Sequence, residues 1–496
     1  MSKSFNIEKL MEASGVKFGT SGARGLAIEM TDSVCYAYTT AFLQHLEETK
    51  QVNVGCKVAI AGDLRPSTPR ICAAVAKAIG DKGYEAIYCG EVPSPAVALY
   101  GLIYEVPSVM VTGSHIPDDR NGIKYNTPFG EIMKTDEQGI RRQTVVLTDE
   151  LCDMKGFFTN ILPLPEVDDE AEELYIKRTT GFFGAEALAG LRIGVYEHSC
   201  VGRDVLKTIY SKLGAEVTGL GRSEKFIPVD TEAIRPEDCA LAAEWGATGK
   251  FDAILSADGD CDRPIIADEN GKWLRGDVAG IICGRFLGAD VVATPVSCNT
   301  AVELCGSFSS VVRTQIGSPY VIAGMKEATA KGAVMVVGYE ANGGFLTNSP
   351  FVSGDKVLSA LPTRDAVILH LALLVESKKR GCTISELAGD LPERYTISNR
   401  LKEFSSEKSQ EKLASFKSGD FSADCLKVEG QFGILCGKVQ GIDQTDGLRI
   451  TFENSEIVHL RPSGNAPELR CYNEAATESR AQELNDKCIA LMEYWR

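Results

Sequence analysis

Hydrophobic and polar positions follow a repeated order along most of the chain, in which short apolar runs are separated by longer amphipathic segments. Three copies of this order predict a strand, a helix and a strand: residues 57–61, 68–82 and 85–89, then 192–196, 203–213 and 216–220, then 290–296, 300–308 and 311–315, with a further helix at 320–330. Strands that alternate with helices through short connections predict largely parallel sheets covered on both faces. The order therefore indicates an α/β protein built from several similar units.

A polar loop containing glycine follows one apolar strand in each unit. Strands at 108–111, 253–255 and 333–337 run into the loops 112–117, 258–263 and 338–344. Open α/β sheets bind their ligands at loops on the carboxyl ends of strands. We therefore expect one working loop in each unit, although the copies share too few residues to be recognised as a repeat from identity alone.

The rest of the chain departs from this order. The proline-containing stretch 162–165 and the acidic residues from Glu166 onward predict a linker between domains, and the apolar run 366–375 is too short to cross a bilayer and predicts a buried helix. Beyond about Arg394, charged helical residues precede the elements of a small α+β fourth domain. These are short strands at 448–452, 457–460 and 469–472, a hairpin turn at 445–447 and an amphipathic helix at 477–494.

Composition narrows the class of protein. A chain of 496 residues is too long for one core and predicts three or four domains, and 44% apolar with 24% charged residues is typical of a soluble globular protein. The formal net charge of −16 disfavours nucleic acid or an anionic membrane as partner, so a phosphorylated substrate would need local basic loops. The 16 cysteines form no CxxC pair and residues 1–9 hold no apolar signal core, which predicts reduced thiols in a cytoplasmic protein.

The loop 258–263 has three aspartates at alternate positions. Asp258, Asp260 and Asp262 would repel one another, so we expect a cation to share the site with them. Carboxylate oxygens without histidine or cysteine suit a hard ion such as Mg²⁺. A calcium-binding EF-hand is excluded because its sixth loop position needs glycine, and here that position is Arg263. A solvated acidic turn is the alternative interpretation.

A serine stands at the centre of the loop 112–117. Ser114 is followed by His115, and Lys124 closes the next short segment at 121–124. A serine hydroxyl is a poor nucleophile unless it is activated, but a phosphoserine can donate a phosphoryl group. Its oxygens can also complete the coordination of an Mg²⁺ held by three aspartates. The alternative is an ordinary strand-to-loop turn.

Two loops can hold an anion. The glycine-rich loop 19–25 offers hydroxyls, backbone N–H groups and Arg24. In the loop 461–467, Arg461, a serine and consecutive backbone amides form an anion nest, to which Arg470 can add a second guanidinium for phosphate. A turn capped by prolines is the alternative for this second loop.

The loop 338–344 is the least specific. Glu340 and Asn342 offer an acceptor and an amide at a spacing suited to vicinal hydroxyls of a sugar, and the glycines after them allow a ligand to approach the backbone closely. Without the other loops this segment would be interpreted as a turn.

The five loops, in this order along nearly the whole chain, resemble those of the α-D-phosphohexomutases, the phosphoglucomutase/phosphomannomutase superfamily, and in particular its bacterial phosphomannomutase-like members. The resemblance implies three similar mixed-sheet α/β domains plus a C-terminal α+β domain around a central active-site cleft. Their expected ranges are 1–163 with the phosphoserine loop, 167–273 with the metal loop, 274–392 with the sugar-contacting loop and 393–496 with the phosphate-binding loop.

The resemblance also implies roles for particular residues. Catalytic roles fall to Ser114, Lys124, Arg24, His115 and Arg263, metal ligation to Ser114, Asp258, Asp260 and Asp262, and substrate binding to Glu340, Asn342, Arg461, Ser463, Gly464, Asn465 and Arg470. It implies one Mg²⁺ per chain, an enzyme that rests as the phosphoserine form, and a hexose 1,6-bisphosphate as activator. The partner would be a small sugar phosphate, with no nucleic acid or membrane, and the oligomeric state is left undefined.

The implied reaction interconverts hexose 1-phosphate and hexose 6-phosphate, with mannose and/or glucose as the sugar. A phosphoglucosamine mutase and a non-catalytic sugar-phosphate-binding protein are the alternatives. The second would be expected to lose Ser114, an aspartate or Lys124, and this chain retains them all. A hydrolase of the alkaline-phosphatase kind needs histidine ligands, and the five histidines here have no metal-binding spacing.

Two departures from the family pattern affect these expectations. Asn342 and Gly344 stand where many prokaryotic members have a serine and then a histidine, so a second proton transfer by that histidine is not expected and the sugar preference is not carried over. Asn465 replaces the usual threonine of the phosphate loop, and phosphate binding is expected to persist because an amide and a hydroxyl both donate hydrogen bonds.

Overall fold

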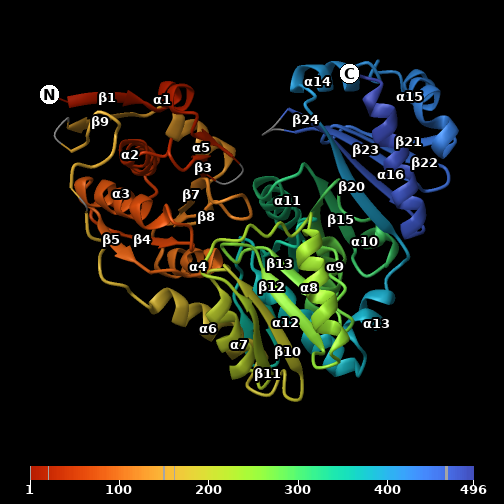
Figure 1. Ribbon diagram of the computed structural model, residues 1–496, viewed down its shortest axis with the longest axis horizontal. Helices are drawn as coiled ribbons and strands as arrows, with labels where there is room; N and C mark the ends of the chain where they lie inside the picture. Colours follow the sequence, from red (N-terminus) through yellow and green to blue (C-terminus); the bar gives the residue numbers. More distant parts are fainter. Residues whose placement is uncertain (1, 20–21, 149–150, 161, 464–466) are drawn as a thin grey trace.

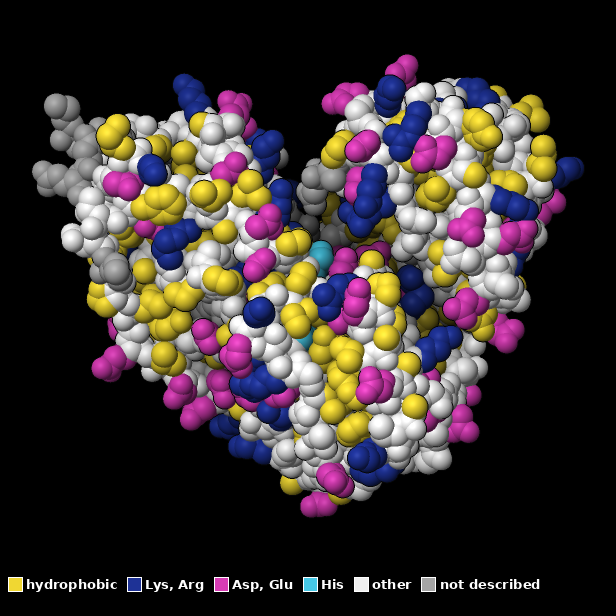
Figure 2. Space-filling model, viewed as in Figure 1, with side chains coloured by type: hydrophobic (Ala, Val, Ile, Leu, Met, Phe, Trp, Pro, Cys, Tyr) yellow, Lys and Arg dark blue, Asp and Glu magenta, His cyan; other side chains and the backbone are white. Residues whose placement is uncertain are grey.

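The computed structural model of the chain describes residues 2–19, 22–148, 151–160, 162–463 and 467–496. Its elements form four units, which we call domains I to IV (Figure 1). Domain I lies on the left of this view, domains II and III below, and domain IV on the upper right. The space-filling view shows a notch between domains I and IV, with basic side chains on its flanks and acidic and histidine side chains at its floor (Figure 2).

Domain I is built on a mixed seven-stranded sheet in the order β2-β3-β7-β6-β4-β5, with β8 paired to β7, and on a separate β1-β9 pair. Its elements are β1 (Ser2–Asn6), α1 (Ile7–Ser14), β2 (Lys17–Phe18), β3 (Gly22–Leu26), α2 (Asp32–Glu48), β4 (Lys57–Gly62), α3 (Thr68–Asp81), β5 (Glu85–Tyr88), α4 (Ser94–Tyr104), β6 (Ser108–Val111), β7 (Arg120–Thr127), β8 (Gly130–Glu131), α5 (Lys134–Arg141) and β9 (Thr144–Thr148). Helix α2 is buried along most of its length and packs on α3.

Domains II and III each contain a four-stranded sheet, in the orders β11-β10-β12-β13 and β15-β14-β16-β17. Domain II comprises α6 (Glu170–Phe183), β10 (Arg192–His198), α7 (Arg203–Lys212), β11 (Glu216–Arg222), α8 (Pro236–Ala247), β12 (Ala253–Ala257) and β13 (Pro264–Ala267). Domain III comprises α9 (Gly276–Leu287), β14 (Val291–Pro295), α10 (Ala301–Leu304), β15 (Ser310–Thr314), α11 (Ser318–Ala330), β16 (Val336–Tyr339), β17 (Phe345–Thr347), the hairpin β18 (Phe351–Ser353) and β19 (Lys356–Leu358), α12 (Ala366–Arg380) and α13 (Ile384–Gly389).

One strand frame recurs in the first three domains. The pairs β4–β6, β10–β12 and β14–β16 are parallel, whereas the strand that follows each working loop pairs antiparallel, as β6–β7, β12–β13 and β16–β17. The order of strands and helices alone predicted largely parallel sheets and did not reveal the antiparallel strand after each loop, whereas the mixed sheets that the family resemblance implied are confirmed. Each working loop is the turn between a buried parallel strand and this antiparallel neighbour.

Domain IV carries an antiparallel five-stranded sheet in the order β20-β24-β23-β22-β21. Its elements are β20 (Tyr395–Lys402), α14 (Ser406–Ala414), α15 (Phe421–Cys436), β21 (Val439–Asp443), β22 (Leu448–Phe452), β23 (Ile457–Pro462), β24 (Glu468–Ala475) and α16 (Glu478–Glu493). The predicted hairpin turn at 445–447 joins β21 to β22, and the predicted C-terminal helix is α16. The α+β prediction for this domain is confirmed.

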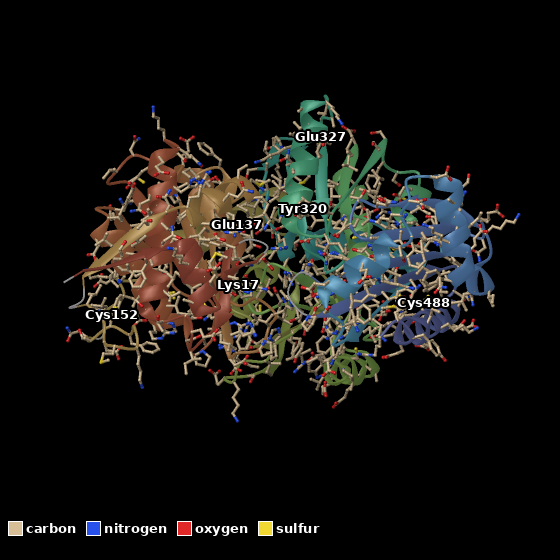
Figure 3. The ribbon with its side chains drawn as sticks, turned by 90° about the horizontal axis from the view of Figure 1, so that it is seen from above. Lys17, Glu137, Cys152, Tyr320, Glu327 and Cys488 are labelled. Carbon is tan, nitrogen blue, oxygen red and sulfur yellow. The ribbon has the colours of Figure 1, made fainter. Side chains whose placement is uncertain are left out.

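The cores show how the domains are joined. The largest apolar cluster runs through domains II and III into α4 of domain I, whereas domain IV has a cluster of its own. The view from above places Cys152 at the outer end of domain I and Cys488, on α16, at the opposite end, with Tyr320 and Glu327 of α11 between them (Figure 3). Domain IV is therefore attached to the rest mainly through polar contacts, such as the hydrogen bond that the backbone N–H of Thr300 in domain III donates to Glu474 Oε2 at 3.0 Å.

Two predicted elements of domain III were wrong in extent. The helix predicted at 300–308 is only the short α10, because Gly306 adopts a left-handed backbone with φ of 62° that ends the helix. The strand predicted at 333–337 begins later, as β16. Within the described residues, no helix is both long and apolar enough to cross a membrane, which agrees with the buried helix predicted at 366–375.

Candidate active site

The serine loop follows β6 and presents Ser114 to domain II. Ser114 is fully buried and holds a left-handed backbone with φ of 57°, a conformation that costs a non-glycine residue on the order of 1 kcal/mol. Its backbone N–H donates to Thr112 Oγ1 at 2.7 Å, and its Oγ donates to Asp258 Oδ2 at 2.6 Å. The serine hydroxyl therefore lies directly against the acidic loop, as the sequence predicted.

Arg65 holds the serine loop in place. Its guanidinium is fully buried and donates to four carbonyl oxygens of the loop, those of Ser114, Ile116, Pro117 and Arg120, at 2.6 to 3.0 Å. It also pairs with Asp63 Oδ2 at 3.0 Å and stacks on the ring of Phe226 from domain II, 4.1 Å from its centroid. The strained backbone of Ser114 is thus supported by one cation that binds the carbonyl of Ser114 itself and three more carbonyls close to it in the chain.

The three aspartates of the acidic loop are buried, and in two of them one carboxylate oxygen accepts hydrogen bonds while the other has none. Asp260 Oδ2 accepts from Ser94 Oγ at 2.5 Å and Lys124 Nζ at 2.5 Å, and Asp262 Oδ2 accepts from Lys124 Nζ at 2.6 Å and Arg364 Nη1 at 3.1 Å. The other oxygen of each, Asp260 Oδ1 and Asp262 Oδ1, is buried with no hydrogen-bond partner among the described residues. Asp260 and Asp262 thus each keep one oxygen without a hydrogen bond, whereas both oxygens of Asp258 accept hydrogen bonds, Oδ2 from Ser114 and Oδ1 from the backbone N–H groups of Asp262 and Arg263.

These free oxygens fit a metal ion. One ligand atom from each of Asp258, Asp260 and Asp262 lies within 4.8 Å of the others, and all three residues are buried. Burial, together with the charges of Asp260 and Asp262, holds the pKa of Asp258 well above its usual range, so a cation bound here would favour the ionised form of all three carboxylates. The donor set contains only oxygen and suits a hard divalent cation such as Mg²⁺.

Cations surround the acidic loop on the side of the serine. Burial would lower the pKa of Lys124, but Asp260 and Asp262 outweigh it and the pKa is raised, so Lys124 is held protonated. Arg263 Nη1 donates to His115 Nδ1 at 2.6 Å, and the same nitrogen of His115 lies 3.4 Å from Ser114 Oγ. Burial and the nearby Arg263 lower the pKa of His115 to about 3, so its imidazole is neutral in this arrangement.

Arg24 lies on β3 beside β7, the strand that carries Lys124. Burial and the charge of Arg263 lower the pKa of Arg24 to about 10, and Asp260 acts in the opposite direction. The structure therefore brings Ser114, Lys124, Arg24, His115 and Arg263 together around the acidic loop, although they come from two domains.

The loop of domain III approaches from the other side. Glu340 is buried, and its Oε2 accepts from Arg364 Nε at 2.7 Å. Asn342 Oδ1 accepts from Gly344 N at 2.9 Å within the same loop, and the carbonyl of Asn342 accepts from Thr231 Oγ1 of domain II at 2.7 Å. The side-chain oxygen of Asn342 therefore shapes its own loop, and its amide nitrogen is the group that can reach a sugar.

Three arginines lie next to one another on neighbouring strands of domain IV. Arg461 and Arg470 are directly opposite one another on β23 and β24, and Arg400 on β20 is opposite Arg470. Like charges in such positions destabilise a sheet, so a row of three arginines indicates an anion-binding face. Arg461 Nε lies 2.8 Å from Asp446 Oδ2, which also accepts from the backbone N–H of Ile316 in domain III. Ser463 is buried next to them, and the predicted Gly464 and Asn465 lie outside the described residues.

Four residues of this site were missed by the sequence reading. Arg65 holds the serine loop, Ser94 and Arg364 donate to the carboxylates of Asp260 and Asp262, and Arg400 extends the row of arginines on a strand that was not predicted. Arg65 could have been found, because it follows the apolar strand β4 just as Ser114 follows β6, and both loops emerge at the same edge of the sheet. For Arg364 the chain pattern holds no comparable signal.

A buried serine against three carboxylates, flanked by cations and faced by an anion-binding surface, defines an enzyme that transfers phosphoryl groups. Comparison with known proteins identifies which one. Family models described as "Phosphoglucomutase/phosphomannomutase, alpha/beta/alpha domain I", "domain II" and "domain III" match residues 15–148, 173–271 and 275–395, and the C-terminal domain model of the same family matches residues 410–491. The chain belongs to the phosphoglucomutase/phosphomannomutase family, within the α-D-phosphohexomutase superfamily, and is a hexose phosphate mutase.

Relatives and solved structures agree. A phosphomannomutase of Salmonella muenchen is 43% identical over 99% of this chain and 98% of its own length, and one of Sinorhizobium fredii is 43% identical over 96% and 99%. A phosphoglucosamine mutase of Clostridium acetobutylicum is 26% identical over 97% and 99%. A phosphoglucomutase/phosphomannomutase family protein from Burkholderia thailandensis shares the fold, with a TM-score of 0.72 at 19% identity over 96% of each chain. The predicted family, enzyme class and α/β fold are confirmed.

Proposed function

We propose that this enzyme interconverts mannose 1-phosphate and mannose 6-phosphate, with or without the glucose phosphates, through a phosphoserine at Ser114 and a bisphosphorylated sugar. The observation that carries the proposal is the 2.6 Å contact between Ser114 Oγ and Asp258 Oδ2, beside two carboxylate oxygens that lack a partner. The two phosphomannomutase relatives at 43% identity support mannose over glucosamine, whose mutase is 26% identical.

In the first half-reaction, the bond between phosphorus and Ser114 Oγ breaks while a bond to the free hydroxyl of the sugar forms. Lys124, which is protonated between two carboxylates, donates its proton to the serine oxygen as the bond to phosphorus breaks, and the proton that the sugar hydroxyl loses passes to Lys124 and restores its charge. Arg263 and Arg24 offset the charge that spreads over the moving phosphoryl group. Mg²⁺ bound by Asp258, Asp260, Asp262 and an oxygen of Ser114 would neutralise more of this charge.

The bisphosphorylated sugar then turns over, and Ser114 takes the other phosphate. Throughout, Arg461, Ser463, Gly464, Asn465 and Arg470 hold whichever phosphate is not reacting, while Glu340 and the amide of Asn342 hold sugar hydroxyls. Closure of domain IV over the notch would keep water from the phosphoserine. A hexose 1,6-bisphosphate restores enzyme that has lost its phosphoryl group and so acts as an activator.

We propose that the enzyme works in the reducing environment of the cytoplasm and that its partners are small sugar phosphates. Of the sixteen cysteines, ten are buried, five are half-buried and one, Cys239, is exposed, a distribution typical of reduced thiols packed in the interior of a cytoplasmic protein. The domain boundaries predicted above remain part of this proposal.

The sugar preference is tested by assaying mannose, glucose and glucosamine 1-phosphates side by side, each with Mg²⁺ and a catalytic amount of the matching bisphosphate. We expect the highest kcat/KM for mannose 1-phosphate and a value at least about tenfold lower for glucosamine 1-phosphate, since one misplaced polar group in a site costs more than ~1.4 kcal/mol. A preference for glucosamine 1-phosphate would favour the alternative mutase. No turnover of any of the three would contradict the proposal.

Arg461→Ala separates phosphate holding from chemistry. Loss of a charge-assisted contact to the distant phosphate costs about 1.5–3 kcal/mol, so KM for the sugar phosphate should rise roughly 10- to 150-fold. Hydrolysis of the phosphoserine should change much less, because Ser114 and the acidic loop are untouched. The matched control is Arg480→Ala, which removes an arginine of the same domain that pairs with Glu456. A normal KM in the Arg461 variant would show that domain IV does not hold the phosphate.

A further inference from the structure

A buried arginine joins the acidic loop of domain II to the sugar loop of domain III. Arg364 Nη1 donates to Asp262 Oδ2 at 3.1 Å, and its Nε donates to Glu340 Oε2 at 2.7 Å. The three side chains are only 2 to 5% exposed. A planar guanidinium that holds two carboxylates in fixed directions restrains both, and here each carboxylate belongs to a different working loop.

The backbone around Arg364 is fixed on both sides. Thr363 Oγ1 donates to Glu131 Oε1 of domain I at 2.7 Å. Asp365 caps the N-terminus of α12, and its carboxylate also accepts from Tyr175 OH at 2.6 Å and from Arg178 Nη1 at 2.9 Å. The arginine is therefore held between two residues that are anchored to domains I and II, so its guanidinium can serve as a rigid strut rather than a mobile side chain.

Gly344 makes room for this side chain. A Cβ at position 344 would lie 2.4 Å from Arg364 Cδ and 2.8 Å from its Cγ, closer than real Cβ atoms approach other atoms. These atoms belong to the middle of a side chain whose end is bound to two carboxylates, so they cannot move aside cheaply. Position 344 is where many prokaryotic members of the family carry a histidine, and in this chain the arginine fills the adjoining space instead.

We propose that Arg364 is a positioning residue that orients Glu340 for the sugar by anchoring it on Asp262, and that Gly344 is required because any side chain there would displace the arginine. The role assigned to Glu340 rests on the proposed function. The steric pairing of Gly344 with Arg364 does not, so the two parts can be tested separately.

The first test measures thermal stability and needs no turnover. We expect Gly344→Ala to lower the apparent melting temperature by at least about 2 °C in the wild type and to have no further effect in an Arg364→Ala background, where the Cβ has space. The control is Gly181→Ala on α6, whose added Cβ meets nothing within 4 Å and should not destabilise. Equal losses from Gly344→Ala in both backgrounds would overturn the pairing, whatever reaction the enzyme performs.

The second test measures kcat and KM for the sugar phosphate in a cycle of Arg364→Ala and Glu340→Gln. Arg364→Ala should lower kcat/KM roughly 10- to 100-fold, largely through KM, and the double variant should stay within about threefold of the poorer single variant, because both lose the same oriented carboxylate. Intact-protein mass should show unchanged phosphorylation of Ser114. Effects that multiply in the double variant would overturn the positioning role.

Arg313→Ala is the matched control for the loss of a largely buried cation. Arg313 belongs to the same domain, pairs with Glu303 at 2.8 Å and is 16% exposed, and none of its hydrogen bonds or ion pairs within the described part of the chain involves Arg364 or its neighbours. Its removal should lower the melting temperature yet leave KM within about twofold of the wild type. A KM defect equal to that of Arg364→Ala would show that both arginines act only through stability, which would contradict the proposal. A wild-type enzyme that turned over no hexose phosphate would refute the proposed function and leave the stability cycle to decide the steric pairing.

Discussion

Ser114→Ala should abolish turnover, with kcat at least about a thousandfold below the wild type, because the variant has no oxygen to carry the phosphoryl group. Freshly purified wild type should contain a phosphorylated population whose added mass maps to residues 112–124, and the variant should lack it. Intact-protein and peptide mass spectrometry measure both, alongside a coupled assay of hexose 1-phosphate turnover.

Ser114→Gly separates the hydroxyl from the backbone. Ser114 has φ of 57°, a region that glycine adopts without strain, so the glycine variant removes the hydroxyl while relieving the left-handed conformation. It should be as inactive as the alanine variant and at least as stable. Ser108→Ala, which removes another buried hydroxyl in domain I, should retain phosphorylation. Substantial activity in either variant at position 114 would refute the phosphoserine mechanism.

Asp260→Asn should weaken Mg²⁺ binding by at least about a hundredfold and reduce turnover at low Mg²⁺ in parallel. Asp260 contributes a buried oxygen without a partner, and the amide removes its negative charge while it preserves the shape of the side chain. Titration calorimetry without substrate measures the binding, and the Mg²⁺ dependence of kcat measures its consequence. Chelation with EDTA should silence the wild type, and added Mg²⁺ should restore it.

Asp268→Asn is the control for this change. Asp268 is a buried carboxylate of the same domain whose Oδ1 accepts from the backbone N–H groups of Asn270 and Lys272 in a turn. Its variant should lose stability and keep normal Mg²⁺ affinity. Equal Mg²⁺ affinity in Asp260→Asn and the wild type would mean that the acidic loop does not bind the metal.

The strands that lead into the working loops could be predicted because they are buried on both faces and therefore read as continuous apolar runs, as 108–111 and 253–257 do. The antiparallel strands after the loops could not. β7 contains Arg120, Asn121 and Lys124 among its apolar residues, and β17 has only three residues, so neither shows a clear period. Their pairing is decided by the sheet that they join.

The residues of the site likewise fall into a group that the sequence could predict and a group that it could not. Ser114, Asp258, Asp260 and Asp262 lie in short motifs whose chemistry is visible in the chain, and the structure brings them together. Ser94 and Arg364 are far from the acidic loop in sequence and reach it only when domains I and III pack on domain II. Such residues have no local pattern, because their partners are set by the tertiary fold.

The recurring strand frame of domains I to III has a consequence for how such an enzyme can change. The loops proposed to carry the phosphoryl donor, the metal and the sugar contacts lie on separate copies of one scaffold, each at the same turn between a parallel strand and its antiparallel neighbour. Substitutions in the third turn can therefore retune the choice of sugar while the donor and the metal stay as they are. In this chain such substitutions are constrained by one side chain, because Arg364 binds a carboxylate of the third turn and a carboxylate of the second. Any exchange of the sugar loop between relatives would have to carry the residues at 344 and 364 together.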